Sequence, residues 1–282
     1  ADRGELVHLA RYSPSVNYMC FNQHTGGSSG LMNNAKIRKA LSLALDRDEF
    51  IELVYDGIHV PAYGIIPGGL MVGDEEFRSY AEEPLKAEAE EYKNNPEKLQ
   101  ALFQEGLAEE GRDTDLSKVE LTFISSGQSV QNKAEQEYFQ QTWEKNLGIK
   151  INMNILADSS LFVAERNANR YDLVYMGWNG DYSDPMTFME LFNTGSGYAK
   201  FMGGYHNEEF DAMFDSLDTI TDSKERAETY KKMEINLVQE NAGVSPLYYK
   251  NEHFFVQPYV KNLSTPLFGT SMDFSRAYIS GK

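Results

Sequence analysis

Residues 119–178 read VELTFISSGQSVQNKAEQEYFQQTWEKNLGIKINMNILADSSLFVAERNANRYDLVYMGW, and strand-like and helix-like patterns alternate along them. The patterns predict strands over 119–125, 149–156 and 171–178 and helices over 134–147 and 161–168. In the longer helix the large apolar side chains share one face, and in the second strand apolar and polar residues alternate. This order of elements indicates the α/β class, with a parallel or mixed β-sheet flanked by helices and joined by right-handed crossovers.

The flanking sequence adds further helices and a closing strand. Ile37, Ala40 and Leu41 begin an apolar stripe at helical spacing after Asn34, and Asp46 followed by Glu49 is the pattern that opens a second helix. Asn95-Pro96 is typical of the start of another helix. Two later helices are predicted over 208–220 and 224–241, and a strand over 244–256. No internal repeat or low-complexity segment interrupts this order.

Composition excludes several classes of function. The chain has 282 residues, 41% of them apolar, and 26 basic against 43 acidic side chains give a net charge of −17. A chain of this length can bury a conventional core without a disulfide, and the single cysteine, Cys20, lies in an apolar run that predicts a buried site. The acidic balance argues against nucleic acid as a partner. Residues 12–31, a long uncharged stretch, contain too many polar residues and glycines to span a membrane.

The sequence offers no catalytic or metal-binding motif. The five histidines lack the spacing of a zinc site, and no second cysteine could supply a ligand. Gly26 to Gly30 lacks the Lys-Ser/Thr ending of a phosphate-binding loop, and no G-x-S-x-G sequence marks a nucleophile. We therefore expect no cofactor, no metal and no enzyme activity.

The loop after the strand over 171–178 is the best candidate for a binding site. Ligands of open α/β sheets bind at the carboxyl ends of strands. The six candidate ligand-binding residues are Gly177, Trp178, Asn179, Gly180, Asp181 and Tyr182. A simpler interpretation makes Trp178 a core residue and both Asp181 and Asp184 turn residues. These two aspartates could also be the acid and nucleophile of a glycoside hydrolase, although two carboxylates on one turn fit that chemistry poorly.

Four stretches resemble the oligopeptide/dipeptide solute-binding proteins of ABC importers, family 5 of the solute-binding proteins. They are the helix with its downstream loop over 34–67, the strand end over 18–22, the helix over 95–106, and Gly177-Trp178-Asn179-Gly180-Asp181-Tyr182-Ser183-Asp184-Pro185. They occur in the family's order and spacing over most of the chain. The resemblance implies a type II periplasmic-binding-protein-like lobe that binds a solute.

The same resemblance implies a domain organisation and partners. Family members close two lobes on a ligand, and this sequence begins where the second lobe would begin. We expect residues 1–258 to form a C-terminal α/β ligand-binding lobe and residues 259–282 to cross back to a missing N-terminal lobe. The expected partners are an oligopeptide ligand, the membrane permease of an ABC importer and that missing lobe. The expected location is extracytoplasmic, as a cell-surface lipoprotein or in the periplasm.

In peptide-binding relatives the aspartate at the position of Asp181 pairs with the peptide α-ammonium, and backbone groups near Trp178 and Asn179 bind the peptide as an added strand. Some relatives have an arginine where this chain has Tyr175. Tyr248 and Tyr249 resemble residues near the cleft, but a core or hinge role fits them equally well. The family also contains binders of nickel complexes, oligosaccharides and opines, and the same fold could serve a peptide-pheromone receptor.

Overall fold

The computed structural model describes residues 6–281 and contains a six-stranded mixed sheet with the order β2-β8-β1-β7-β5-β6. Its strands are β1 (Val7–Phe21), β2 (Val60–Pro61), β5 (Glu120–Ser126), β6 (Lys150–Leu156), β7 (Leu173–Asn179) and β8 (Val244–Val256). β5 runs parallel to β6 and β7, whereas β1 is antiparallel to β7 and β8, and β2 is antiparallel to β8. The predicted α/β class and mixed sheet are confirmed.

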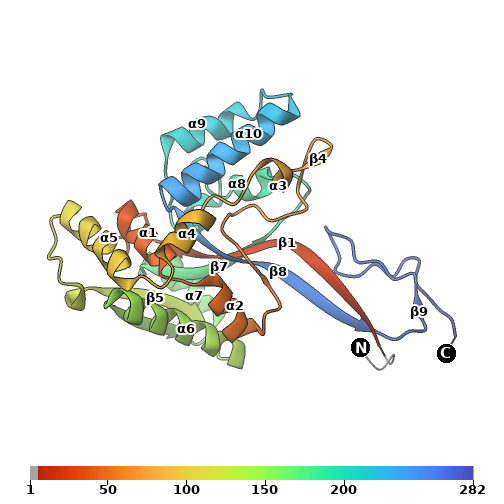
Figure 1. Ribbon diagram of the computed structural model, residues 1–282, viewed down its shortest axis with the longest axis horizontal. Coiled ribbons are helices and arrows are strands. Elements are labelled where there is room, and N and C mark those ends of the chain that lie inside the picture. Colours follow the sequence, from red (N-terminus) through yellow and green to blue (C-terminus); the bar gives the residue numbers. More distant parts are fainter. Residues whose placement is uncertain (1–5, 282) are drawn as a thin grey trace.

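Helices cover both faces of this sheet. They are α1 (Ala35–Leu43), α2 (Arg47–Tyr55), α3 (Phe77–Tyr80), α4 (Lys86–Tyr92), α5 (Pro96–Glu109), α6 (Val130–Leu147), α7 (Ser159–Asn167), α8 (Met186–Met189), α9 (Glu208–Ser216) and α10 (Ser223–Glu234). A π-helical turn, Ile235–Glu240, continues α10. In Figure 1, α3, α8, α9 and α10 gather on one side of the sheet, and α1, α2, α5 and α6 on the other.

The helix starts follow the sequence closely. The side chains of Asn34, Asp46, Asn95 and Asp222 cap α1, α2, α5 and α10 by accepting hydrogen bonds from backbone N–H groups that have no partner within the helix. One helix is shorter than predicted: α9 ends at Ser216 rather than residue 220. The hydroxyl of Thr219 donates to the carbonyl oxygen of Ser216, which closes the last turn.

Strand β1 is the main feature that the residue pattern did not predict. It has 15 residues and fills the centre of the sheet between β8 and β7, whereas the sequence indicated only its end over 18–22. Pro14 interrupts its apolar pattern, and the pairing with β8 shifts register between Tyr12 and Val16. A proline and a bulge together hide the alternation by which strands are recognised.

The outer parts of β1 and β8 extend beyond the helices as a two-stranded ribbon (Figure 1). The two-stranded pairing of β9 (Val260–Lys261) with β10 (Tyr278–Ile279) follows it. The buried guanidinium of Arg11 joins ribbon and tail, because it pairs with Glu252 at 2.5 Å and donates to the carbonyl oxygens of Pro266 at 2.8 Å and Leu267 at 2.9 Å.

A single hydrophobic core lies between the sheet and its helices. Cys20 is fully buried in it, as predicted, and Trp143 of α6 is the largest fully buried side chain. Among residues 6–281, the longest and most apolar helices still fall short of what a membrane crossing requires.

Candidate functional site

Most of one edge of β7 has no strand partner. On the β1 side, pairing extends over the whole strand, from Leu173 opposite Phe21 to Asn179 opposite Ser15. On the β5 side, only Leu173 and Val174 are paired. The backbone over 175–179 therefore borders no described strand on that side, and such an edge can accept an added strand.

The loop after β7 is fixed by backbone contacts. The N–H of Gly180 donates to the carbonyl oxygen of Pro14 at 2.7 Å, and the N–H of Asp181 donates to the hydroxyl of Thr187 at 3.1 Å. The Asp181 side chain is exposed, and its carboxylate forms no hydrogen bond or ion pair within residues 6–281. A fixed backbone thus presents an unpaired carboxylate to solvent.

Asp184 has a different environment. Its Oδ1 accepts hydrogen bonds from the N–H of Met186 at 2.8 Å and from the hydroxyl of Tyr230 at 2.6 Å, and its Oδ2 lies 3.6 Å from Nε of Arg226. These contacts hold the start of α8 against α10. Since Asp184 is engaged in this structural role, the two aspartates do not form the matched pair of a glycoside hydrolase.

The remaining loop residues add aromatic surface and negative charge. Trp178 packs edge-on against Tyr198 with ring centroids 5.1 Å apart, and its buried Nε1 has no hydrogen-bond partner among the described residues. Tyr182 is 42% exposed, and partial burial together with the nearby carboxylates raises its pKa to about 12. Burial and Asp181 raise the pKa of Glu190, which places a second acidic group near Asp181. Together the carboxylates of Asp181 and Glu190 favour a positively charged ligand group.

Gly177 and Asn179 lie on the opposite face of β7 from Trp178. A Cβ at Gly177 would approach the side-chain nitrogen of Asn17 to 2.8 Å. Glycine at this position therefore leaves room for the Asn17 amide, which lies against it. The main chain at Gly177 is exposed as a result. The structure therefore groups all six predicted residues at one strand end, with the main chain and the Asp181 carboxylate accessible.

Tyrosine hydroxyls from three elements meet on the same face as Gly177. Tyr175 of β7 and Tyr248 of β8 lie 2.7 Å apart at their hydroxyls, and Tyr55 at the end of α2 is 3.2 Å from the first and 2.9 Å from the second. The hydroxyl of Tyr55 donates to Glu135 of α6 at 2.7 Å. We call these four residues the tyrosine–glutamate cluster. Sequence reasoning missed it, because its members are far apart in the chain.

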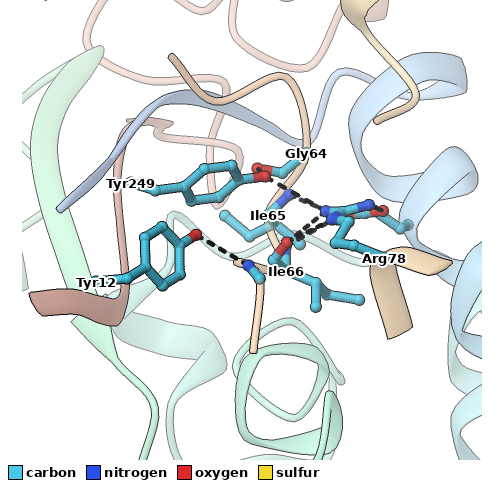
Figure 2. A network of polar contacts seen from close by, with 8 residues as sticks. Tyr12, Gly64, Ile65, Ile66, Arg78 and Tyr249 are labelled. Atoms are coloured by element: carbon cyan, nitrogen blue, oxygen red, sulfur yellow. Dashed lines mark hydrogen bonds and ion pairs between the residues drawn. The ribbon is translucent and has the colours of Figure 1, made fainter. Parts of the chain in front are cut away.

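Tyr249 takes part in a separate network, which holds residues 64–68 in place (Figure 2). Its hydroxyl donates to the carbonyl oxygen of Gly64 at 3.0 Å. Arg78 and Glu234 form a buried ion pair at 2.6 Å, and Glu234 also accepts the N–H groups of Ile65 and Ile66. Tyr248 and Tyr249 are each 4% exposed, so both are core residues in this chain.

This segment continues to the loop after β7. The hydroxyl of Tyr12 accepts from the N–H of Gly68 at 2.9 Å, and the N–H of Met71 donates to the hydroxyl of Ser183 at 3.3 Å. The segment that the network in Figure 2 holds in place therefore leads to Met71, which contacts the loop that carries Asp181. In the part of the chain that the structure describes, no group of three or more His, Cys, Asp or Glu side chains is placed to hold a metal ion.

The structure thus places a fixed, solvent-accessible loop at one strand end of a mixed α/β sheet. The family described as bacterial extracellular solute-binding proteins, family 5 Middle, matches residues 2–200, and the chain belongs to this family. Members of the family bind solutes, which confirms the expectation of a binding protein rather than an enzyme.

Several curated relatives are named for peptides. The dipeptide-binding protein of Lactococcus lactis subsp. cremoris is 28% identical over 275 residues, which are 94% of this chain and 47% of that protein. The oligopeptide-binding protein OppA of Bacillus subtilis is 28% identical over 237 residues, which are 83% of this chain and 41% of that protein. The chain thus spans less than half the length of these two relatives.

Solved structures agree with the fold. The substrate-binding domain of an oligopeptide ABC transporter from Bacillus anthracis superposes with a TM-score of 0.78 at 24% identity, covering 98% of this chain and 51% of that one. Peptide-bound OppA of Listeria monocytogenes gives a TM-score of 0.77 at 24% identity, with 98% and 50% coverage. These matches confirm the expected fold, a type II periplasmic-binding-protein-like lobe.

Proposed function

We propose that this chain is the peptide-binding lobe of an extracytoplasmic substrate-binding component of an ABC importer. The observation that carries this proposal is the unpaired edge of β7 leading directly to the unpaired carboxylate of Asp181. Family membership and the peptide-binding names of the relatives support it. The permease and a second lobe, toward which the ribbon and residues 259–282 would extend, are the partners in this proposal.

The binding mode follows from the chemistry of the two features. A peptide laid along residues 175–179 forms main-chain hydrogen bonds that do not depend on its side chains. Asp181 then accepts the α-ammonium in a charge-assisted hydrogen bond, which fixes the end and the register of the peptide. The bound peptide runs from the edge of β7 to Asp181. Along this path it passes Gly177, Trp178, Asn179 and Gly180, and Tyr182 lies just beyond Asp181. This arrangement suits a binder of many peptide sequences.

An amide-resolved NMR titration tests the proposal. The ligand is an alanine-rich hexapeptide with a free amine, and its N-acetylated form is the matched comparison. Shifts over residues 177–182 with the free amine, and much weaker shifts with the acetylated peptide, are expected. Equal shifts with both peptides, or no shifts at millimolar concentration with either, would contradict Asp181 as the amine anchor of this lobe. The variant Asp181→Asn should lose the difference between the two peptides. Asp218→Asn is its control, because Asp218 is also an exposed aspartate but lies near the end of α9.

A further inference from the structure

The tyrosine–glutamate cluster lies beside the unpaired edge of β7, at some distance from Asp181. Tyr175 precedes Asn179 by four residues, which is about 13 Å along a strand. Tyr55, Tyr175 and Glu135 are only partly buried, so the cluster is not sealed within the core. Because side chains alternate between the faces of a strand, a peptide added at this edge would direct every second side chain to the face that carries the cluster.

Counting protons shows what the cluster can bind. Each phenol has one hydroxyl proton. The proton of Tyr55 goes to Glu135, so the protons of Tyr175 and Tyr248 fill two of the three hydroxyl contacts of 2.7, 2.9 and 3.2 Å. No hydroxyl proton is left for a ligand, whereas oxygen lone pairs remain. The cluster can therefore accept hydrogen bonds from a ligand but cannot donate them.

The charge of the cluster points the same way. Within residues 6–281 the Glu135 carboxylate forms no ion pair, and the hydroxyl of Tyr55 is its hydrogen-bond donor. Partial burial of a carboxylate without a nearby cation costs free energy. A ligand that supplies the cation offsets that cost, so its binding is favoured. The aromatic rings around it, including Phe139 at 5.5 Å from the ring of Tyr175, would contact the aliphatic part of a long side chain.

We propose that the tyrosine–glutamate cluster is a subsite for a lysine or arginine side chain of the bound peptide, with Glu135 as the group that pairs with the cation. This inference rests on the proposed function, since it requires a peptide along β7. It gives a transporter of mixed peptides a preference at one downstream position, in addition to the anchor at the amino end.

A positional scan tests the subsite. Hexapeptides of alanine and glycine with a free amine carry one lysine, or its uncharged counterpart norleucine, at each position from the second to the sixth, and dissociation constants are measured by NMR titration of the 282-residue chain. The net charge of −17 attracts lysine at every position, so only a preference confined to particular positions counts. At such a position we expect lysine to bind about three- to tenfold more tightly than norleucine.

Two variants assign that preference to its residue. Glu135→Gln keeps an oxygen for the Tyr55 hydroxyl and should remove the lysine preference while norleucine peptides bind as before. Glu137→Gln is the matched control, because Glu137 is an exposed residue on another face of α6, and it should keep the preference. Equal affinity for lysine and norleucine at all positions, or a preference that survives in Glu135→Gln, would overturn the subsite. If no free-amine peptide binds, the proposed function itself is wrong and the subsite falls with it.

Discussion

The hydroxyl of Tyr230 donates a 2.6 Å hydrogen bond to the carboxylate of Asp184, three residues beyond the exposed carboxylate of Asp181. Tyr230 is fully buried, and Arg226 donates to its hydroxyl at 2.7 Å while also facing Asp184. One aspartate of the loop is thereby part of the structure that holds the loop, and the other is available to a ligand. The two side chains should respond differently to mutation.

Tyr230→Phe should destabilise the fold without removing the site. The substitution leaves Asp184 and Arg226 without the shared hydroxyl, which costs about 1–2 kcal/mol of unfolding free energy. Urea unfolding followed by circular dichroism measures the change, and Tyr182→Phe, at a partly exposed phenol, is the control with little expected change. An unfolding free energy equal to that of the wild type would show that the Tyr230 contact does not hold the loop.

Removing one partner of the buried pair between Arg78 and Glu234 should be strongly destabilising. The side chain of Glu234 is 1% exposed. Arg78→Met would leave the buried charge of Glu234 without a counterion, which should lower the free energy of unfolding by about 3–5 kcal/mol. The double variant Arg78→Met/Glu234→Leu removes both charges and should lose less than the sum of the two single variants. Additive losses in denaturant unfolding would contradict the coupling.

His59 should make stability depend on pH. It stacks on Tyr248 with ring centroids 4.5 Å apart, and burial, with Lys250 and His253 nearby, lowers its pKa from 6.5 to about 4. Between these values the unfolded chain binds the proton more tightly than the folded chain does, so stability is lost as the pH falls from about 6.5 to 4. After discounting for partial exposure, the loss is about 1–2 kcal/mol.

Comparison with His59→Phe isolates this effect from the general response of an acidic chain. The difference in unfolding free energy between wild type and variant should shift by that amount between pH 7 and pH 4.5, in favour of the variant at low pH. His206→Phe, at an exposed histidine, should follow the wild type. Parallel pH profiles for wild type and His59→Phe would contradict the lowered pKa.

The sequence predicted the elements that rest on local chemistry. The caps at Asn34 and Asp222 satisfy N–H groups within a few residues of themselves, so the residue pattern contains them. The start of the loop after β7 also followed from the strand that precedes it. The length of β1 did not, because Pro14 and the register shift after Tyr12 break the alternation, and its position depends on pairing with segments more than 150 residues away.

The parts of the site that depend on distant contacts were not predictable either. Residues 181 and 184 have the same side chain in one turn, and only the fold brings Tyr230 to the second of them. The tyrosine–glutamate cluster joins residues 55, 135, 175 and 248, and no local spacing indicates it. The unpaired edge of β7 likewise depends on where its pairing with β5 stops.

The central claim is that Asp181 binds the α-ammonium of a peptide, and a double comparison of Asp181→Asn with N-acetylation of the peptide tests it most directly. The account predicts that the wild-type chain and Asp218→Asn bind the free-amine peptide about tenfold more tightly than the acetylated one. Asp181→Asn should bind both peptides equally, with the affinity that the wild type has for the acetylated form. If Asp181→Asn still prefers the free amine as strongly as the wild type does, another group binds the ammonium and the account is wrong.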